Sequence, residues 1–196
     1  MRPSLTLCLA LTLAFGSRAA AQPKDAPTAD ERAAIAAIVK AGGQGEIDPK
    51  LDPAARVVAK FDAGADAALL ALKKFPQVGA VEVFDGSKLT DKGLKALPEL
   101  PHLRRLAVGK SDMTPARVAP IAKCKELRDL RLPEAGLSNA ELAALAPLAL
   151  LEQLDLSGNA QLGDKAMATV KEFERLRALF LSKTAITDAG LAELKG

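Results

Sequence analysis

Apolar residues recur along the chain at a nearly constant period from Val78 onwards. The first apolar residue of each copy is Val78, Leu103, Leu127, Leu151 or Leu176, so successive copies lie 25, 24, 24 and 25 residues apart. Each copy then carries two apolar residues two positions apart, which is the spacing of one face of a short strand. These pairs are Val81/Val83, Leu106/Val108, Leu130/Leu132, Leu154/Leu156 and Leu179/Leu181. A fixed period of this size predicts a solenoid of stacked repeats.

The second half of each copy predicts a short helix, because apolar residues recur there at three-residue steps. These residues are Leu94/Leu97/Leu100, Val118/Ile121/Cys124, Leu142/Leu145/Leu148, Met167/Val170/Phe173 and Leu191/Leu194. Each set is preceded by a residue suited to open a helix, where a short side chain can accept hydrogen bonds from the first unpaired helical N–H groups. These residues are Thr90, Thr114, Ser138, Gly163 with Asp164, and Thr187. Units this small bury their apolar faces only by stacking, so we expect an α/β solenoid with a parallel concave sheet and convex helices.

The repeated L-x-x-L-x-L cores, together with T-D-K-G-L at 90–94 and I-T-D-A-G-L at 186–191, resemble the leucine-rich repeat family. The resemblance covers residues 78–196 and points to the helix-bearing subtype of ribonuclease-inhibitor-like and cysteine-containing repeats, as in exported bacterial proteins. It implies a binding module rather than an enzyme. The family often places Asn or Cys at the ninth repeat position, where only Asn159 matches, so we expect no continuous asparagine ladder.

Residues 1–21 differ in composition from the repeats. Arg2 gives a minimal positive end, an apolar run extends from Leu5 to Phe15, and three alanines at 19–21 fit a small-residue cleavage site. The pattern predicts a secretory signal peptide cut before Gln22, and therefore export to the periplasm or the extracellular space. An uncleaved anchor is the alternative, but the run is shorter than the ~20 residues of a spanning helix. We expect no membrane span after cleavage.

Residues 22–56 predict a tether, a capping helix and a loop ahead of the repeats. Thr28 and Glu31 have the spacing of a capping box, and two glycines at 42–43 end the helical pattern. We expect this helix to cover the N-terminal end of the solenoid core, and residues 43–56 to form a turn-rich loop. Residues 57–77 resemble a degenerate repeat, so the predicted leucine-rich repeat domain spans 57–196, with five clear repeats over 78–196.

Composition limits the classes of partner. Signal cleavage removes Arg2 and Arg18 and no acid, so the formal net charge falls from +3 to +1. With 3% aromatic residues, no Trp, no Tyr and no dense basic run, we do not expect nucleic acid as a partner. Cys124 is the one cysteine of the mature chain and shares a column with Leu100 and Leu148, so we expect a buried hydrophobe rather than a reactive thiol.

No set of residues predicts catalysis, a metal or a cofactor. His102 is the one histidine, and it lies in a loop before a strand without Ser or Cys at a catalytic spacing. The sequence has no cluster of Cys or His with zinc-ligand spacing. Asp91, Asp164 and Asp188 recur at equivalent positions in the expected first helical turn, where negative charge complements the helix dipole.

Strand alternation places three columns of side chains on the concave sheet face. The columns are Ala80, Arg105, Asp129, Gln153, Ala178; Glu82, Ala107, Arg131, Asp155, Phe180; and Phe84, Gly109, Pro133, Ser157, Ser182. Our candidate partner-binding residues are Arg105, Asp129, Arg131, Asp155 and Phe180. One interpretation is a solvated ladder of charge pairs, worth roughly 0.2–1 kcal/mol each. The other is a mixed-charge platform in which arginine and phenylalanine anchor a partner.

Three functions are compatible with these patterns. The leading hypothesis is an exported module that binds a protein partner of unknown identity through the concave sheet face. The alternative is a structural envelope component that associates through the solenoid ends, because no capping motif follows Leu194. An enzyme whose site is not visible in the sequence is the third and weakest hypothesis. The sequence does not indicate the oligomeric state.

Overall fold

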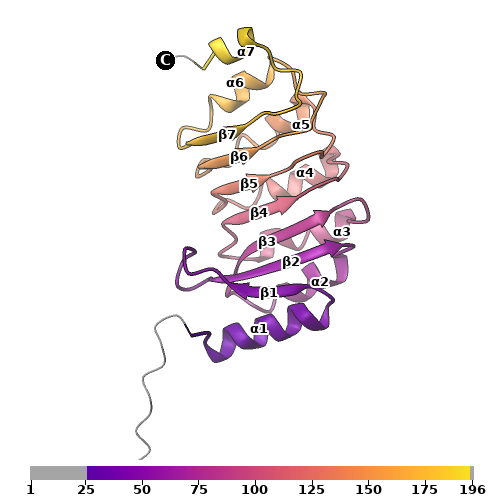
Figure 1. Ribbon diagram of the computed structural model, residues 1–196, viewed down its shortest axis with the longest axis vertical. Coiled ribbons are helices and arrows are strands. Elements are labelled where there is room, and N and C mark those ends of the chain that lie inside the picture. The colour runs from indigo at the N-terminus through magenta and orange to yellow at the C-terminus, as the bar shows by residue number, and fades with distance from the viewer. Residues whose placement is uncertain (1–25, 195–196) are drawn as a thin grey trace, which may run out of the picture.

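The computed structural model describes residues 26–194, which form one elongated stack of a sheet and a row of helices (Figure 1). The strands are β1 (Gln44–Ile47), β2 (Val57–Ala63), β3 (Val78–Asp85), β4 (Arg105–Val108), β5 (Asp129–Arg131), β6 (Gln153–Asp155) and β7 (Ala178–Phe180). The helices are α1 (Ala29–Lys40), α2 (Asp66–Leu72), α3 (Asp91–Leu94), α4 (Pro115–Ile121), α5 (Asn139–Ala143), α6 (Ala166–Val170) and α7 (Asp188–Ala192), with a 3-10 turn, η1 (Leu97–Glu99). The predicted signal peptide, residues 1–21, lies outside the described residues.

The strand register follows the repeat alignment. Strands adjacent in sequence are neighbours in the sheet, and every pair after the antiparallel β1 and β2 is parallel. Leu106 lies opposite Leu130, Leu130 opposite Leu154, and Leu154 opposite Leu179. The first three of these leucines are fully buried between the sheet and the helices. The predicted α/β solenoid with a parallel sheet is therefore confirmed.

The N-terminal end of the core is closed by α1. The predicted capping box is present, since the Glu31 N–H donates to the Thr28 hydroxyl and the Thr28 N–H donates to the Glu31 carboxylate. Glu31 is almost fully buried and also accepts two hydrogen bonds of 3.0 Å from the Arg56 guanidinium. Ala34 and Ile38 of α1 belong to the hydrophobic core. The capping helix is thus tied to the residue that precedes β2.

The expectation of a loop over residues 43–56 is wrong in its first part. Gln44–Ile47 forms β1, which pairs antiparallel with residues 57–60 of β2. Exposed and half-buried residues alternate along β1, and the strand occupies the edge that β2 would otherwise expose. Residues 48–56, named here the β1–β2 loop, connect the two strands.

Polar contacts join successive repeats at the starts of their helices. Asp66 accepts the backbone N–H of Thr90 at 2.8 Å and the Thr90 hydroxyl. Asp164 accepts the same two groups of Thr187, at 2.7 and 2.8 Å, and these bonds lower the pKa of Asp164. The expectation that Asp164 lies in the first turn of its own helix is wrong, because α6 begins at Ala166 and Asp164 bonds the next repeat. The other two recurring aspartates do lie in first helical turns.

Two glycines make room for these contacts. A Cβ on Gly93 would lie 2.3 Å from Asp66 Oδ1, and a Cβ on Gly190 would lie 2.3 Å from Asp164 Oδ1. Both distances are far inside van der Waals contact. The glycine of each T-D-x-G-L string therefore accommodates the aspartate of the preceding repeat.

Asn159 is buried and bonds the backbone of two repeats. Its Oδ1 accepts the N–H groups of Ala135 and Leu137, each at 3.0 Å. Its amide nitrogen donates to the carbonyls of Leu132 and Leu156, at 2.9 and 2.8 Å. One side chain thus satisfies four backbone groups around the turn that follows β5.

Asn159→Ala should lower the free energy of unfolding by about 3 kcal/mol, because buried backbone groups lose their partners. Ser111→Ala is the matched control, since Ser111 holds the same repeat position and its buried hydroxyl has no partner within residues 26–194. We expect no loss for the control in urea denaturation of residues 22–196. Equal losses in the two variants would contradict the role given to the Asn159 bonds.

Glu31 should make the free energy of unfolding fall as the pH is lowered into the acid range. Burial by itself would raise the pKa of Glu31, but the bonds from Arg56 and Thr28 outweigh it and lower the pKa below its ordinary value of 4.5. A carboxyl with a lowered pKa in the folded state stabilises the protein above the unfolded pKa and loses this contribution as the pH falls. Unfolding free energies of the wild type and Glu31→Gln should therefore converge below pH 4.5.

Urea denaturation between pH 7 and pH 3 measures this convergence. Glu172→Gln is the control, because Glu172 is exposed, and its curve should run parallel to that of the wild type. A constant difference between the wild type and Glu31→Gln at every pH would exclude a titrating ion pair between α1 and Arg56.

Candidate binding face

The side of the sheet opposite the helices carries Glu82, Phe84, Arg131, Asp155 and Phe180, and is named here the outer sheet face. Phe84, near the end of β3, is 58% exposed, and Phe180, at the end of β7, is 53% exposed. The strand register aligns Glu82, Arg131, Asp155 and Phe180 in one column through Ala107 of β4. The predicted alternation of buried and outward side chains therefore holds along the second and third columns.

The first predicted column is not open to solvent along its length. Ala80 is fully buried, and Asp129 is 9% exposed. The β1–β2 loop lies along this side of the sheet, because Asp48 forms an ion pair with Arg105 at 3.0 Å. Buried residues therefore occur in the first column, whereas the second and third columns contain none.

Arg131 is held by an ion pair along its own strand. Its guanidinium donates two hydrogen bonds to Asp129, at 2.9 and 2.7 Å. The cross-strand pair of Arg105 and Asp129 is also present, at 3.2 Å, as the alternation predicts. Asp155 lies opposite Arg131 in the register, but the hydrogen bonds of Arg131 go to Asp129 instead. The hydrogen bond to Asp129 is the main cause that raises the pKa of Arg131.

A hollow of about 200 Å³, named here the face hollow, lies at the ends of β3 to β6. Its apolar surface comes from Phe84, Ala107, Gly109 and Pro133, and its charged groups are Glu82, Arg131 and Asp155. A Cβ on Gly109 would lie 2.8 Å from the Phe84 carbonyl oxygen, so the close approach of these two strands requires glycine there.

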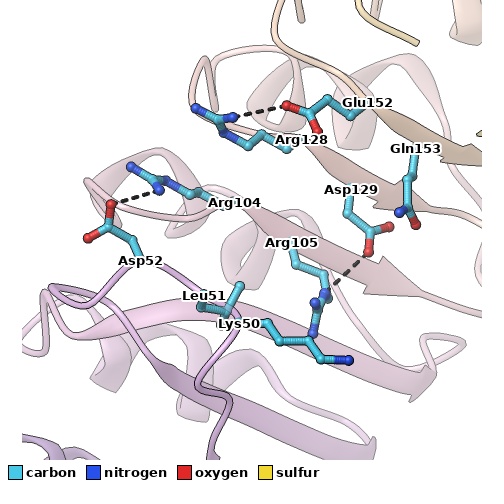
Figure 2. Close-up of a pocket in the computed structure, with 9 residues that line it drawn as sticks. All are labelled: Lys50, Leu51, Asp52, Arg104, Arg105, Arg128, Asp129, Glu152 and Gln153. Carbon is cyan, nitrogen blue, oxygen red and sulfur yellow. Dashed lines mark hydrogen bonds and ion pairs between the residues drawn. The ribbon is translucent and has the colours of Figure 1, made fainter. Parts of the chain in front are cut away.

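A second pocket, of about 280 Å³, lies where the chain enters β4 to β6 (Figure 2). Its ion pairs are Arg104 with Asp52 at 2.8 Å, Arg128 with Glu152 at 2.9 Å, and Arg105 with Asp129 at 3.2 Å. Lys50 and Leu51 line it from the β1–β2 loop. Each guanidinium in this pocket therefore already has a carboxylate partner.

The other candidates for chemistry are inert or isolated. Burial raises the pKa of Cys124 to about 12, so the thiol stays protonated at neutral pH, and the predicted buried hydrophobe is confirmed. His102 lies half-buried in the turn before β4. Residues 26–194 contain no group of three or more Asp, Glu, His or Cys placed to hold a metal ion. Within the same range, every helix is too short or too polar to cross a membrane.

Comparison with known proteins agrees with this geometry. The family model for the leucine-rich repeat matches residues 149–170, which include all of β6 and α6, next to the last repeat of the stack. The matched segment is similar to one leucine-rich repeat, and the fold is an α/β solenoid of leucine-rich-repeat type. Its strands form one sheet that is parallel from β2 to β7, and its helices cover one face of that sheet (Figure 1).

Two solved structures from Listeria monocytogenes are similar to this solenoid. One is an internalin (inlF), with 26% sequence identity, a TM-score of 0.45 and coverage of 63% of this chain. The other is internalin C2, with 19% identity, a TM-score of 0.45 and coverage of 65% of this chain. This chain covers 34% of the first protein and 62% of the second.

The solenoid brings four of the five candidate residues into one cluster. Arg105, Asp129, Arg131 and Asp155 lie on three successive strands, and Phe180 follows on β7 opposite Asp155. Sequence analysis missed the β1–β2 loop as a neighbour of this cluster. The one available signal was the charge of the loop, and its partners lie far away in sequence.

Asp129→Asn should lower the free energy of unfolding by about 2 kcal/mol, because a mostly buried carboxylate loses charge-assisted bonds from two arginines. Asp155→Asn is the matched control on the neighbouring strand and should cost about 1 kcal/mol or less, because Asp155 is half-buried and its carboxylate accepts a single hydrogen bond from within residues 26–194, that of the Ser157 N–H. Urea denaturation at pH 7 compares them. A loss in Asp155→Asn as large as that in Asp129→Asn would contradict the bonding described for Arg131.

Proposed function

We propose that the mature protein, residues 22–196, is an exported module that binds another protein through the outer sheet face, the concave face of the predicted solenoid. The observation that carries this proposal is the face hollow, which lies beside the exposed Phe84 and the half-exposed Arg131. Aromatic and arginine side chains are the residue types that dominate binding energy at protein interfaces. The leucine-rich repeat fold, a scaffold typical of binding modules, supports the same function.

Preorganisation supports this face as the binding surface. Asp129 fixes the Arg131 guanidinium with two bonds, so a partner meets an ordered side chain rather than a mobile one. The backbone beneath it is a sheet in continuous register from β3 to β7. Binding to an ordered surface avoids part of the entropy that ordering of side chains costs.

Export rests on the sequence of residues 1–21, which has the charged start, apolar run and small-residue end of a signal peptide. The T-D-x-G-L strings further support assignment to the helix-bearing subtype of leucine-rich repeats.

A structural role through the solenoid end is the second candidate, and the last repeat favours it. Leu176, Leu179 and Leu181 are only partly buried, and Leu191 is 44% exposed. A hollow of about 390 Å³ beside β7 is lined by Phe173 and by apolar residues of this repeat. Such a surface suits association with another protein subunit within an envelope assembly.

Affinity capture from envelope extract with tagged residues 22–196 separates the two candidates. Arg131→Glu/Phe180→Ala changes the outer sheet face, and we expect this variant to lose the captured partner. Lys171→Glu/Leu191→Ala is the matched variant, since it makes one charge reversal and one apolar truncation beside the last repeat. It should retain the partner.

The reverse pattern, with capture lost only in Lys171→Glu/Leu191→Ala, would refute the outer sheet face and support the structural role. Urea midpoints of both variants, measured alongside, exclude unfolding as the cause of lost capture.

A further inference from the structure

The face hollow is present because one strand contributes only small side chains to it. Ala107 and Gly109 of the β4 segment lie between Phe84 on one side and Pro133 on the other. The volume of about 200 Å³ is below the roughly 300–1,000 Å³ of pockets that hold drug-sized ligands. The hollow therefore suits one side chain of a partner rather than a whole small molecule.

The charge around the face hollow is predominantly negative. Arg131 is the one cation that lines it, and its guanidinium is already bound by two hydrogen bonds to Asp129. Asp155 accepts one hydrogen bond from the Ser157 N–H at 2.9 Å, and within residues 26–194 it forms no ion pair. The Asp155 carboxylate thus keeps acceptor capacity at the edge of the hollow.

Glu82, the second carboxylate of the hollow, has one long ion pair among the described residues, and like Asp155 it lies near enough to Arg131 to contribute to the raised pKa of that guanidinium. Lys60 lies 4.0 Å from Glu82 but 2.6 Å from Glu46, which is its nearer partner. The charged residues that line the hollow are the carboxylates Glu82 and Asp155 and the cation Arg131, whose guanidinium is bound to the Asp129 carboxylate. Two carboxylates and one paired cation line the hollow, so its net charge is negative and favours a positive ligand.

We infer that the face hollow accepts a basic side chain, lysine or arginine, of the protein partner. This inference rests on the proposed function, because it names the chemistry of the residue that the outer sheet face binds. The apolar stem of the basic residue packs against Phe84 and Pro133, while its cation meets the carboxylates of Glu82 and Asp155. A cation beside the exposed Phe84 ring gains a further attraction from the π system.

An acidic partner side chain on Arg131 is the competing arrangement. It would have to replace or share the two bonds to Asp129, and it would approach the carboxylates of Glu82 and Asp155. Like charges at such short distances oppose binding. The structure therefore favours a basic residue over an acidic one.

Selection from a phage-displayed library of random peptides on immobilised residues 22–196 tests the inference without a known partner. We expect the selected peptides to share a lysine or arginine. Replacement of that residue by Met in a synthetic peptide should weaken binding by about tenfold or more, the contribution of one charge-assisted hydrogen bond. Affinity should also fall as salt is added.

Variants of the protein locate the basic residue. Glu82→Gln/Asp155→Asn should weaken binding of the selected peptide by at least about tenfold. Ala107→Leu, which fills the hollow, should weaken binding by a similar factor. Glu172→Gln/Asp188→Asn removes two exposed carboxylates on the helix side and should leave the affinity unchanged. Urea midpoints show whether each variant is folded.

The outcomes separate this inference from the proposed function. Peptides that depend on Arg131 and Phe180 but carry no common basic residue, or that bind Glu82→Gln/Asp155→Asn normally, would overturn the inference and leave the proposed function standing. A selection that yields no peptide sensitive to Arg131→Glu/Phe180→Ala or to Ala107→Leu would overturn both.

Discussion

Stacking of leucine side chains between neighbouring repeats is the interaction on which the rest of the structure depends. Leu106, Leu130 and Leu154 are fully buried, although each belongs to a strand of only three or four residues. No single repeat could bury these side chains alone. The capping helix α1, fastened through Glu31 and Arg56, closes the N-terminal end of the same core.

The outer sheet face follows from that stacking. Because inward leucines fix the register, the residues between them are fixed outward, and a slip by one residue would exchange the two sides. The buried side of the sheet therefore determines where Arg131, Asp155 and Phe180 lie on the other. Polar contacts between repeats, such as the bonds from Thr187 to Asp164, join the starts of successive helices in addition to the leucine stacking.

Sequence periodicity predicts what is periodic and misses what is not. The columns of Leu130 and Asp129 follow from the 24-residue spacing, and the Thr28 capping box follows from a local motif. The strand β1 was missed, because its four residues belong to no repeat and their pattern is too short to separate from a turn. The contact between Asp48 and Arg105 joins residues 57 positions apart, which spacing does not indicate. Arg131 bonds Asp129 rather than Asp155, because side-chain rotamers and not register decide between two near carboxylates.

The outer sheet face is tested most directly by methyl NMR of alanine-labelled residues 22–196 with and without the captured protein partner. Ala107 lies in the face hollow, Ala143 is exposed on α5, and Ala192 is exposed on α7 in the last repeat. Binding should shift or broaden the Ala107 signal and leave those of Ala143 and Ala192 in place. A shift of Ala143 or Ala192 with Ala107 unchanged would contradict binding through this face.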